Sequence, residues 1–302
     1  MNKFNLAIIG SSRIAQIHYK FLKEYNFSKI FFVGRNTKKI LNFLNKNKIF
    51  KVSTIEKKKI NQNFFDIVSI CNNTNNHQDY LNLITKVPKL LVVEKPIISI
   101  RIFKKDYKKY LKKIYKKFNS IIIVYPMVFL ARSILNLICI KNKVKTIEIH
   151  YYTSGEERGG EIFIDLSPHA LTFFYEICKL SKIKLTKTFQ IKKNVKPKIW
   201  IGSITYKNIK LLMNFKKISK REKSKFFVKI NNLNINRITR KKNGVFINYL
   251  KFKNKITQIE NPMKSVFEDA INSIIKRKIF RENKYLTNWL MELTEKIYFN
   301  KS

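Results

Sequence analysis

Three residues of this chain have the chemistry of a proton-transfer site. Asp165 and His169 are four residues apart, and Lys95 stands much earlier in the chain, between Glu94 and Pro96. Residues four apart on a helix lie on one face. A histidine can take up a proton near neutral pH, and an ammonium group can stabilise charge that develops on an oxygen. Lys95, Asp165 and His169 are therefore the candidate catalytic residues for oxidising an alcohol, where a base removes the hydroxyl proton as a hydride leaves.

A glycine-led turn near the start of the chain predicts a dinucleotide site. The apolar run 4–9 ends at Gly10, and a helical pattern begins a few residues later. A strand, a tight glycine turn and a helix N-terminus together form a cradle for a pyrophosphate. Ser12 occupies the place where a second glycine would let the backbone approach the phosphates. We expect the cofactor to contact Gly10, Ser12, Arg13 and Ile14.

The end of the second predicted strand bears on the choice of cofactor. An NAD site usually presents an acid here to hold the ribose hydroxyls, but this chain has no acid between Glu24 and Glu56. It has Arg35 instead, and a guanidinium suits the 2′-phosphate of NADP. We therefore expect NADP to be preferred, with NAD as the alternative. The predicted contacts at this strand end are Arg35, Asn36 and Lys38.

The elements that must position these residues follow from the hydrophobic pattern. In the first part of the chain, short apolar runs alternate with helical patterns, which indicates a parallel sheet of the Rossmann type. From about residue 119 the pattern changes to amphipathic strands with basic turns, one of them predicted over Lys216–Lys225. We predict an α/β protein with a Rossmann domain over residues 1–118. Residues 119–302 are expected to form an α+β domain with a large, mainly antiparallel sheet for substrate binding and oligomerisation.

The charge of the chain is extreme. It has 63 Lys and Arg against 19 Asp and Glu, a formal net charge of +44. Nucleic acid or an anionic membrane could explain such a charge. We favour a compositional bias toward Lys, Asn and Ile, and expect neither partner. Cys71, Cys139 and Cys178 show no CxxC spacing, and no secretory signal is apparent, so reduced thiols in a cytoplasmic protein are expected. No metal site is predicted.

Four ordered motifs give the chain a resemblance to the Gfo/Idh/MocA (glucose-fructose oxidoreductase and inositol dehydrogenase) family. They are GSSRIAQIH from Gly10, SICNNTNNHQDY from Ser69, VVEKP from Val92 and GGEIFIDLSPH from Gly159. The resemblance implies that Lys95 contacts the reacting hydroxyl and the nicotinamide ribose, that His169 is the general base and that Asp165 orients it. It also implies a homo-oligomer, a dimer or tetramer. Further cofactor contacts implied in this way are Cys71, Asn72, Thr74, Asn76, His77 and Glu94.

These observations predict an oxidoreductase that uses NADP, or NAD, to interconvert a secondary alcohol and a ketone. The expected substrate is a small molecule: a sugar, sugar nucleotide or cyclitol. A protein that binds NADP(H) for regulation without catalysis is one alternative, but it would not need Lys95, Asp165 and His169. A basic nucleic-acid-binding protein is a weaker alternative, which rests on the +44 charge alone.

Overall fold

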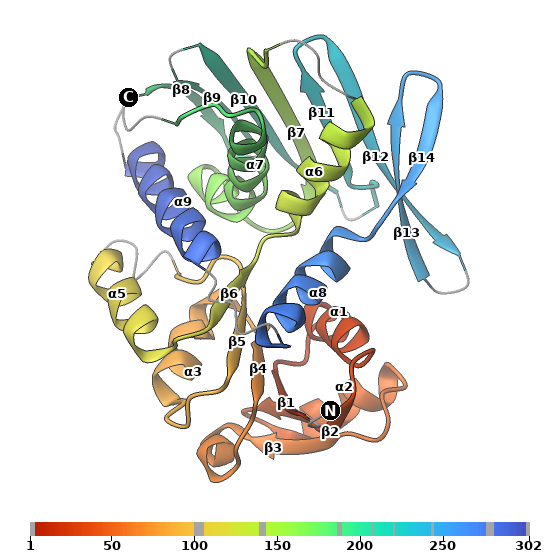
Figure 1. The fold of residues 1–302 in the computed structure, drawn as a ribbon, viewed down its shortest axis with the longest axis vertical. Coiled ribbons are helices and arrows are strands. Elements are labelled where there is room, and N and C mark those ends of the chain that lie inside the picture. The colour runs from red at the N-terminus through yellow and green to blue at the C-terminus, as the bar shows by residue number, and fades with distance from the viewer. Residues whose placement is uncertain are drawn as a thin grey trace. The chain divides into compact units, whose positions relative to one another are not determined.

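The computed structural model describes residues 4–99, 106–138, 143–185, 189–206, 208–219, 221–242, 245–275 and 281–299. They form two compact units (Figure 1). The first unit consists of Met1–Val124 and Val266–Thr287, and the second of Tyr125–Ser265 and Asn288–Ser302. The first unit thus takes in a late segment of the chain that the sequence-based division at residue 118 had placed in the second domain.

The first unit is built on a six-stranded sheet in which every neighbouring pair is parallel. The strands in the middle of this sheet are nearly continuous apolar runs, as expected when helices cover both faces. In spatial order they are β3 (Ser53–Glu56), β2 (Phe27–Gly34), β1 (Phe4–Ile9), β4 (Ile67–Ile70), β5 (Leu90–Glu94) and β6 (Ile121–Val124). The predicted Rossmann architecture is confirmed. Because the strand order reverses between β1 and β4, their carboxyl ends mark the switch point where ligands bind in such sheets.

Helices and short 3-10 turns connect these strands. They are α1 (Arg13–Leu22), α2 (Thr37–Lys46), η1 (Lys57–Gln62), η2 (Thr74–Asn76), α3 (His77–Leu83) and α5 (Tyr107–Lys117). On α5, Leu111 and Ile114 are buried, whereas the lysines at positions 108, 109, 112, 113 and 116 are exposed. This is the arrangement of a helix that covers a sheet with one face and is solvated on the other.

The late segment joins the first unit through specific contacts. Phe267, on α8 (Pro262–Ile275), packs its ring edge-on against His18 of α1, with 4.8 Å between the centroids. Asn283, on α9 (Arg281–Phe299), bonds both backbone groups of Ile123 in the edge strand β6, each at 2.9 Å. The side-chain amide of Asn283 therefore pairs with the backbone N–H and C=O of this edge strand as a neighbouring strand would. No local sequence pattern predicts this return of the chain.

The second unit is built on an eight-stranded sheet. All neighbouring strands are antiparallel except β7 and β10, so the predicted mainly antiparallel sheet is confirmed. In spatial order the strands are β14 (Lys255–Ile259), β13 (Val245–Phe252), β12 (Leu233–Lys242), β11 (Lys225–Ile230), β7 (Thr146–Ser154), β10 (Ile209–Ile218), β9 (Ile199–Tyr206) and β8 (Gln190–Lys196).

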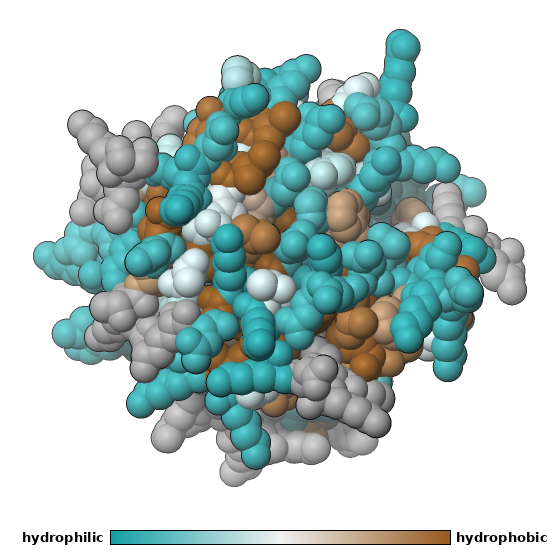
Figure 2. Space-filling model, turned by 90° about the horizontal axis from the view of Figure 1, so that it is seen from above, coloured by the Kyte–Doolittle hydropathy of each residue, from teal (hydrophilic) through white to brown (hydrophobic). Residues whose placement is uncertain are grey.

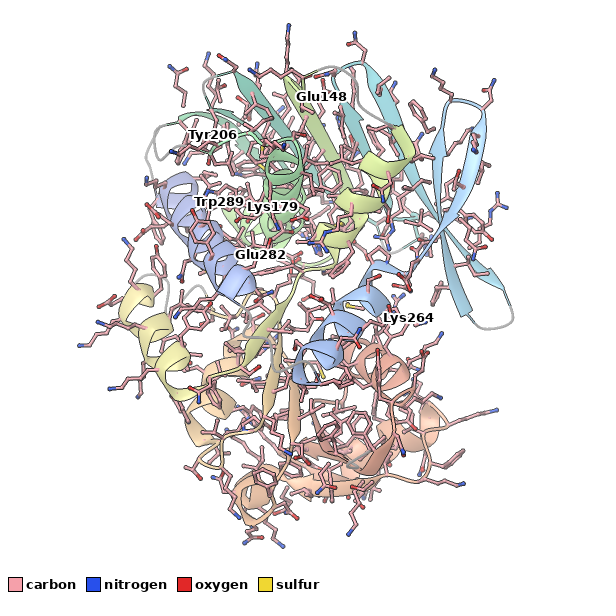
Figure 3. The ribbon with its side chains drawn as sticks, in the orientation of Figure 1. Glu148, Lys179, Tyr206, Lys264, Glu282 and Trp289 are labelled. Carbon is pink, nitrogen blue, oxygen red and sulfur yellow. The ribbon has the colours of Figure 1, made fainter. Side chains whose placement is uncertain are left out.

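Two helices of this unit are α6 (Pro126–Ile138) and α7 (Gly160–Leu180), which lie on one side of the sheet (Figure 1). The apolar stretch that begins at Ile121 is the strand β6 followed by the helix α6. On α7, Tyr175 packs against Trp289, with 5.2 Å between the ring centroids. Trp289 is labelled in Figure 3.

The prediction of a basic turn over Lys216–Lys225 is wrong at both ends. Lys216 and Lys217 belong to β10, and Lys225 opens β11. These strands are not neighbours, because β7 lies between them and pairs with both. The connection therefore crosses β7 and is not a hairpin turn. Lys217 is 3% exposed, so a residue expected in a solvated turn is part of the interior.

Other expectations from the composition concern the surface and the cysteines. Hydrophilic residues are spread across the face shown in Figure 2, with smaller hydrophobic areas among them. Cys71 and Cys178 are buried free thiols, and Cys139 lies outside the described residues. Within the part of the chain that the structure describes, no helix has the length and apolarity of a membrane span. No group of potential metal ligands is found among the described residues either.

Candidate active site

The first unit places the predicted cofactor residues at the carboxyl end of its sheet. Gly10 follows β1 and lies against the backbone that follows β4. Its φ is +131°, and a Cβ added there would meet Asn72 N at 3.1 Å and Cys71 C at 3.2 Å. Only glycine fits this position, because it tolerates positive φ and has no side chain to collide with the neighbouring loop. The chain thus makes a close backbone approach at the switch point.

Ser12 caps the helix that starts at this turn. Its hydroxyl accepts a hydrogen bond from Ala15 N at 3.4 Å and donates one to Cys71 O at 3.3 Å. Arg13 and Ile14 are the first two residues of α1. The first N–H groups of a helix have no acceptor within the helix and carry the positive end of its dipole, so they favour an anion. Ser12 therefore tightens the turn and leaves the helix N-terminus in place.

Arg35 directly follows β2, at the same carboxyl end of the sheet. Arg35 Nη2 donates to Asn76 Oδ1 at 2.7 Å and to Asp79 Oδ2 at 3.0 Å. Lys57 Nζ lies 3.1 Å from the same Asp79 oxygen. The hydrogen bond from Lys57 and the charges of both cations lower the pKa of Asp79. Two cations thus share one carboxylate, and Asn36 caps α2 by accepting from Lys39 N at 3.0 Å.

The loop after β4 has a buried polar interior. The Oδ1 atom of Asn72 is buried and has no hydrogen-bond partner among the described residues. His77, at the start of α3, uses Nε2 to bond Asn72 O at 3.0 Å. Burial lowers the pKa of His77, although the Asn72 carbonyl and Glu94 act in the opposite direction. Thr74 and Asn76 lie on the 3-10 turn between them.

The side chain of Cys71 is buried beside the Gly10 turn. Its thiol is buried and donates to Ile9 O at 3.3 Å, and burial raises its pKa well above the ordinary value. The sulfur therefore ties β4 to β1. Only the backbone of Cys71 lines the Gly10 turn. That Cys71 contacts the cofactor stays a prediction. Because the thiol is buried against Ile9 O, such a contact would use main-chain atoms of Cys71.

A buried hydrogen-bonded chain underlies the segment around Lys95. His18, fully buried on α1, bonds Ser69 Oγ at 2.7 Å through Nδ1 and Glu94 Oε1 at 2.8 Å through Nε2. The second oxygen of Glu94 accepts from Lys95 N at 3.2 Å. Lys95 precedes Pro96 through a cis peptide bond. The sequence did not single out His18 as a functional residue, although it closes the first of the four motifs.

The second unit contains the other two predicted catalytic residues, both on α7. Asp165 Oδ2 lies 2.8 Å from Lys217 Nζ of β10, and Glu157 Oε2 lies 2.6 Å from the same nitrogen. His169 meets the edge of the Tyr151 ring, with 5.2 Å between the centroids. Lys217 and Tyr151 escaped the sequence analysis. Their strands are separated from α7 in sequence, and lysine is too common here to attract notice.

Comparisons with known proteins agree with this architecture. Residues 4–125 match the family model GFO_IDH_MocA, described as an oxidoreductase family with an NAD-binding Rossmann fold. No curated protein matches the sequence. The UDP-N-acetylglucosamine 3-dehydrogenase GnnA from Acidithiobacillus ferrooxidans has a similar structure, with a TM-score of 0.68 at 10% identity. That comparison covers 98% of this chain and 97% of GnnA.

Two further solved structures contain a nicotinamide cofactor. An oxidoreductase from Agrobacterium radiobacter in complex with NAD+, L-tartaric acid and magnesium gives a TM-score of 0.66 at 12% identity, over 98% of this chain and 96% of that one. A variant of the 3-ketoreductase KijD10 from Actinomadura kijaniata, in complex with TDP-benzene and NADP, gives 0.71 at 9% identity, over 98% and 97%. At these identities the similarity establishes the fold.

Proposed function

We propose that this chain, whose residues 4–125 match the family model GFO_IDH_MocA, is an NADP-preferring dehydrogenase or reductase acting on a CH–OH group. The substrate that we propose is a sugar, sugar nucleotide or cyclitol. The observation that supports this most directly is the Gly10 turn, where a Cβ would collide with the backbone after β4. A chain conformation this tight, beside a helix N-terminus, is the arrangement that holds a dinucleotide.

The residues at the switch point suit a dinucleotide cofactor. The first turn of α1 offers N–H groups to a pyrophosphate, and the buried, unpartnered Asn72 Oδ1 offers an acceptor. A bound nicotinamide supplies the acceptor or donor of the hydride. Glu94, joined to His18 and to Lys95 N, fixes the start of the segment that presents Lys95.

Arg35 supports NADP over NAD. Its pair with Asp79 is exposed, with 61% of the Arg35 side chain and 44% of the Asp79 side chain accessible. Exposed ion pairs contribute only about 0–1 kcal/mol, so a phosphate can replace the carboxylate at little cost. Lys57 then remains as the partner of Asp79. The 2′-phosphate of NADP would gain a guanidinium suited to bidentate binding.

The proton chemistry falls to Lys95, Asp165 and His169. We assign His169 as the base that accepts the hydroxyl proton on a ring nitrogen when an alcohol is oxidised, and as the acid in the reverse direction. Lys95 donates a hydrogen bond to the reacting oxygen and stabilises its developing charge. Asp165, held by Lys217, fixes the electrostatic surroundings of the imidazole. Each role is implied by the family resemblance and by the chemistry of the side chain.

The structural relatives support the substrate class. GnnA is a UDP-N-acetylglucosamine 3-dehydrogenase. KijD10 is a 3-ketoreductase whose solved complex contains TDP-benzene and NADP. Both names are consistent with a sugar or sugar nucleotide as the substrate of this chain.

We also propose a cytoplasmic homo-oligomer that uses the face of the eight-stranded sheet opposite α7. His150 stacks on Phe227 there, with 4.1 Å between the centroids, and Ile201 is 45% exposed. Glu148 of β7, labelled in Figure 3, lies two residues from His150 on the same side of the strand. Sedimentation velocity tests this proposal. A protein that sediments as a monomer at every concentration measured would refute the homo-oligomer.

The first experiment is a titration of the purified protein with NADPH and with NADH at matched ionic strength, followed by nicotinamide fluorescence. Tight binding of NADPH with weaker binding of NADH is expected. If the protein binds neither NADPH nor NADH, the proposal that it is a nicotinamide-dependent enzyme is refuted. Turnover is then measured for Lys95→Ala and His169→Ala with any sugar that the wild type oxidises. Undiminished turnover in either variant refutes the assigned roles.

A further inference from the structure

Arg237, an arginine of the second unit, lies on the same face of the eight-stranded sheet as α7, the helix that bears Asp165 and His169. Residues opposite each other on neighbouring strands point to the same face of a sheet. Tyr151 is opposite Phe226, and Phe226 is opposite Arg237 of β12. Tyr151 contacts His169 of α7, and Phe226 lies edge-on to Tyr151 at 5.6 Å. Arg237 therefore belongs to the face of the sheet that α7 covers, two strands away from Tyr151.

The partners of Arg237 are all neutral. Its Nε and Nη2 donate to Asn248 Oδ1 at 3.2 and 2.8 Å, and Thr239 donates to the same oxygen at 3.3 Å. Among the described residues, Nη1 has no hydrogen-bond acceptor, and it is not one of the buried unpartnered atoms. Two nitrogens of the guanidinium, Nε and Nη2, are thus held by Asn248. The third, Nη1, is left for an acceptor from outside the part of the protein that the structure describes. Burial lowers the pKa of Arg237, while the nearby Tyr151 raises it.

Two other cations on the same unit are paired with carboxylates. Lys217 pairs with Asp165 and Glu157, and Arg132 Nε lies 2.7 Å from Glu176 Oε1. Every aspartate and glutamate of the chain lies within the described residues. Among these described acids, none forms an ion pair with Arg237. Arg237 therefore differs from its neighbours in lacking a carboxylate.

A structural role alone explains this arrangement poorly. A charge removed from water is costly unless it is paired, and an apolar side chain in its place is often at least as stabilising. The buried amide of Asn248 needs donors, but neutral side chains could supply them. An anion that arrives with a ligand would supply the missing counter-charge.

Building on the proposed function, we infer that Arg237 binds an anionic group of the substrate, either a carboxylate or a phosphate. A guanidinium matches both groups, because its parallel N–H donors can bond two oxygens at once. The distance of two strands from Tyr151 places the anion away from the carbon that reacts at His169. Arg237 is then a specificity-determining residue: it selects charged sugars over neutral ones and takes no part in proton transfer.

Three hexoses that differ only at carbon 6 test this inference. D-glucose has a hydroxymethyl group, D-glucuronate a carboxylate and D-glucose 6-phosphate a phosphate. We would measure their binding to the full chain without cofactor by isothermal titration calorimetry at fixed ionic strength. The variants are Arg237→Gln, Arg237→Lys and the control Arg240→Gln. Arg240 is three residues further along β12, exposed, with its guanidinium over the Tyr249 ring, so its loss removes the same charge from the other face.

The wild type should bind at least one charged hexose more tightly than glucose, and the preferred one identifies the anion. Arg237→Gln should weaken that binding about tenfold or more, Arg237→Lys should restore part of it, and Arg240→Gln should leave it unchanged. Equal affinity of all three sugars for the wild type overturns the inference. So does failure of both charged sugars to bind, or an equal loss in the two glutamine variants.

A measurement on the wild type covers the case in which Arg237→Gln does not fold. Phenylglyoxal modifies accessible arginines, and peptide mass spectrometry locates the modification. The bound charged hexose should protect Arg237 and not Arg240, whereas equal protection of both overturns the inference. These measurements need no cofactor. If the protein binds charged hexoses through Arg237 but does not bind NADPH, the anion site stands and the proposed enzyme is refuted. If it binds NADPH but no charged hexose, the anion site is refuted and the proposed enzyme stands.

Discussion

Lys217 Nζ lies 2.8 Å from Asp165 Oδ2, and only 2% of the Lys217 side chain is exposed. The same nitrogen contacts Glu157 in the segment that precedes α7. One buried ammonium therefore ties β10 to the helix that bears His169 and to the segment leading into it. It also keeps a positive charge next to Asp165. The aspartate is thus held by a residue that no sequence motif indicates.

Replacement of Lys217 by methionine should destabilise the second unit and impair turnover. The change leaves the two partly exposed carboxylates without their shared cation, which we expect to cost about 2 kcal/mol. Lys216→Met is the matched control, because Lys216 is exposed on the same strand. Urea unfolding gives the stability, and kcat is measured with NADPH saturating. If both variants lose stability equally, the buried ion pair has no special role.

The same contact predicts a loss of stability at alkaline pH. Burial alone lowers the pKa of Lys217, but the hydrogen bonds and charges of Asp165 and Glu157 outweigh it and raise the pKa above its ordinary value. A raised pKa in the folded state stabilises the protein below the unfolded value of about 10.4, and this contribution is lost as pH rises through the folded pKa. The difference in unfolding free energy between wild type and Lys217→Met should therefore be constant near neutral pH. A difference that persists unchanged above about pH 11 contradicts this.

Gly10→Ala should abolish or greatly weaken NADPH binding. The new Cβ would meet backbone atoms of Cys71 and Asn72 at 3.1–3.2 Å, with φ in a region that side chains avoid. We expect a cost of about 1–3 kcal/mol in stability as well. Gly34→Ala is the control, since a Cβ there meets the movable end of the Ile40 side chain. Fluorescence titration of both variants makes the comparison, and normal binding by Gly10→Ala would rule out the turn as the phosphate cradle.

Arg35→Gln should reduce the preference for NADPH. We expect NADPH affinity to fall about 10- to 100-fold, the loss of a charge-assisted contact, while NADH affinity stays the same. Stability should change by less than about 1 kcal/mol, because the Arg35–Asp79 pair is exposed. Lys46→Gln, an exposed lysine at the end of α2, controls for net charge. Equal losses for both cofactors would show that Arg35 does not read the 2′-phosphate.

His18→Leu should destabilise the first unit and weaken cofactor binding. The buried Glu94 carboxylate would lose its 2.8 Å partner, at a cost of about 2–4 kcal/mol. His18→Gln can still reach Glu94 and should recover part of the loss. Ser69→Ala removes the other hydrogen bond of the ring and should cost about 1 kcal/mol. A leucine variant no less stable than Ser69→Ala would show that Glu94 does not depend on His18.

Local patterns in the sequence were sufficient for much of the fold. Apolar runs alternating with helical spacing identify β1, α1, β4 and β5, because a buried parallel strand must be apolar on both faces. The Gly10 turn could be recognised from its neighbours alone, and so could the Asp165 and His169 pair. Weaker patterns were missed. The strand β3 has only intermediate or exposed residues, and the nine residues before β9 have no clear strand pattern although β8 lies there.

What the sequence determined by itself is the order of motifs along the chain: the glycine turn, Arg35 after the second strand, the Lys95 segment, and the Asp165 and His169 pair. Each depends on residues close together in sequence, so spacing suffices. Only the tertiary structure decided which side chains meet across the sheets. Lys217 reaches Asp165 from β10, His18 reaches Glu94 from α1, and Arg237 comes into line with Tyr151 two strands away. These contacts depend on strand order and register, which arise from packing distant segments together and leave no periodic trace in the chain.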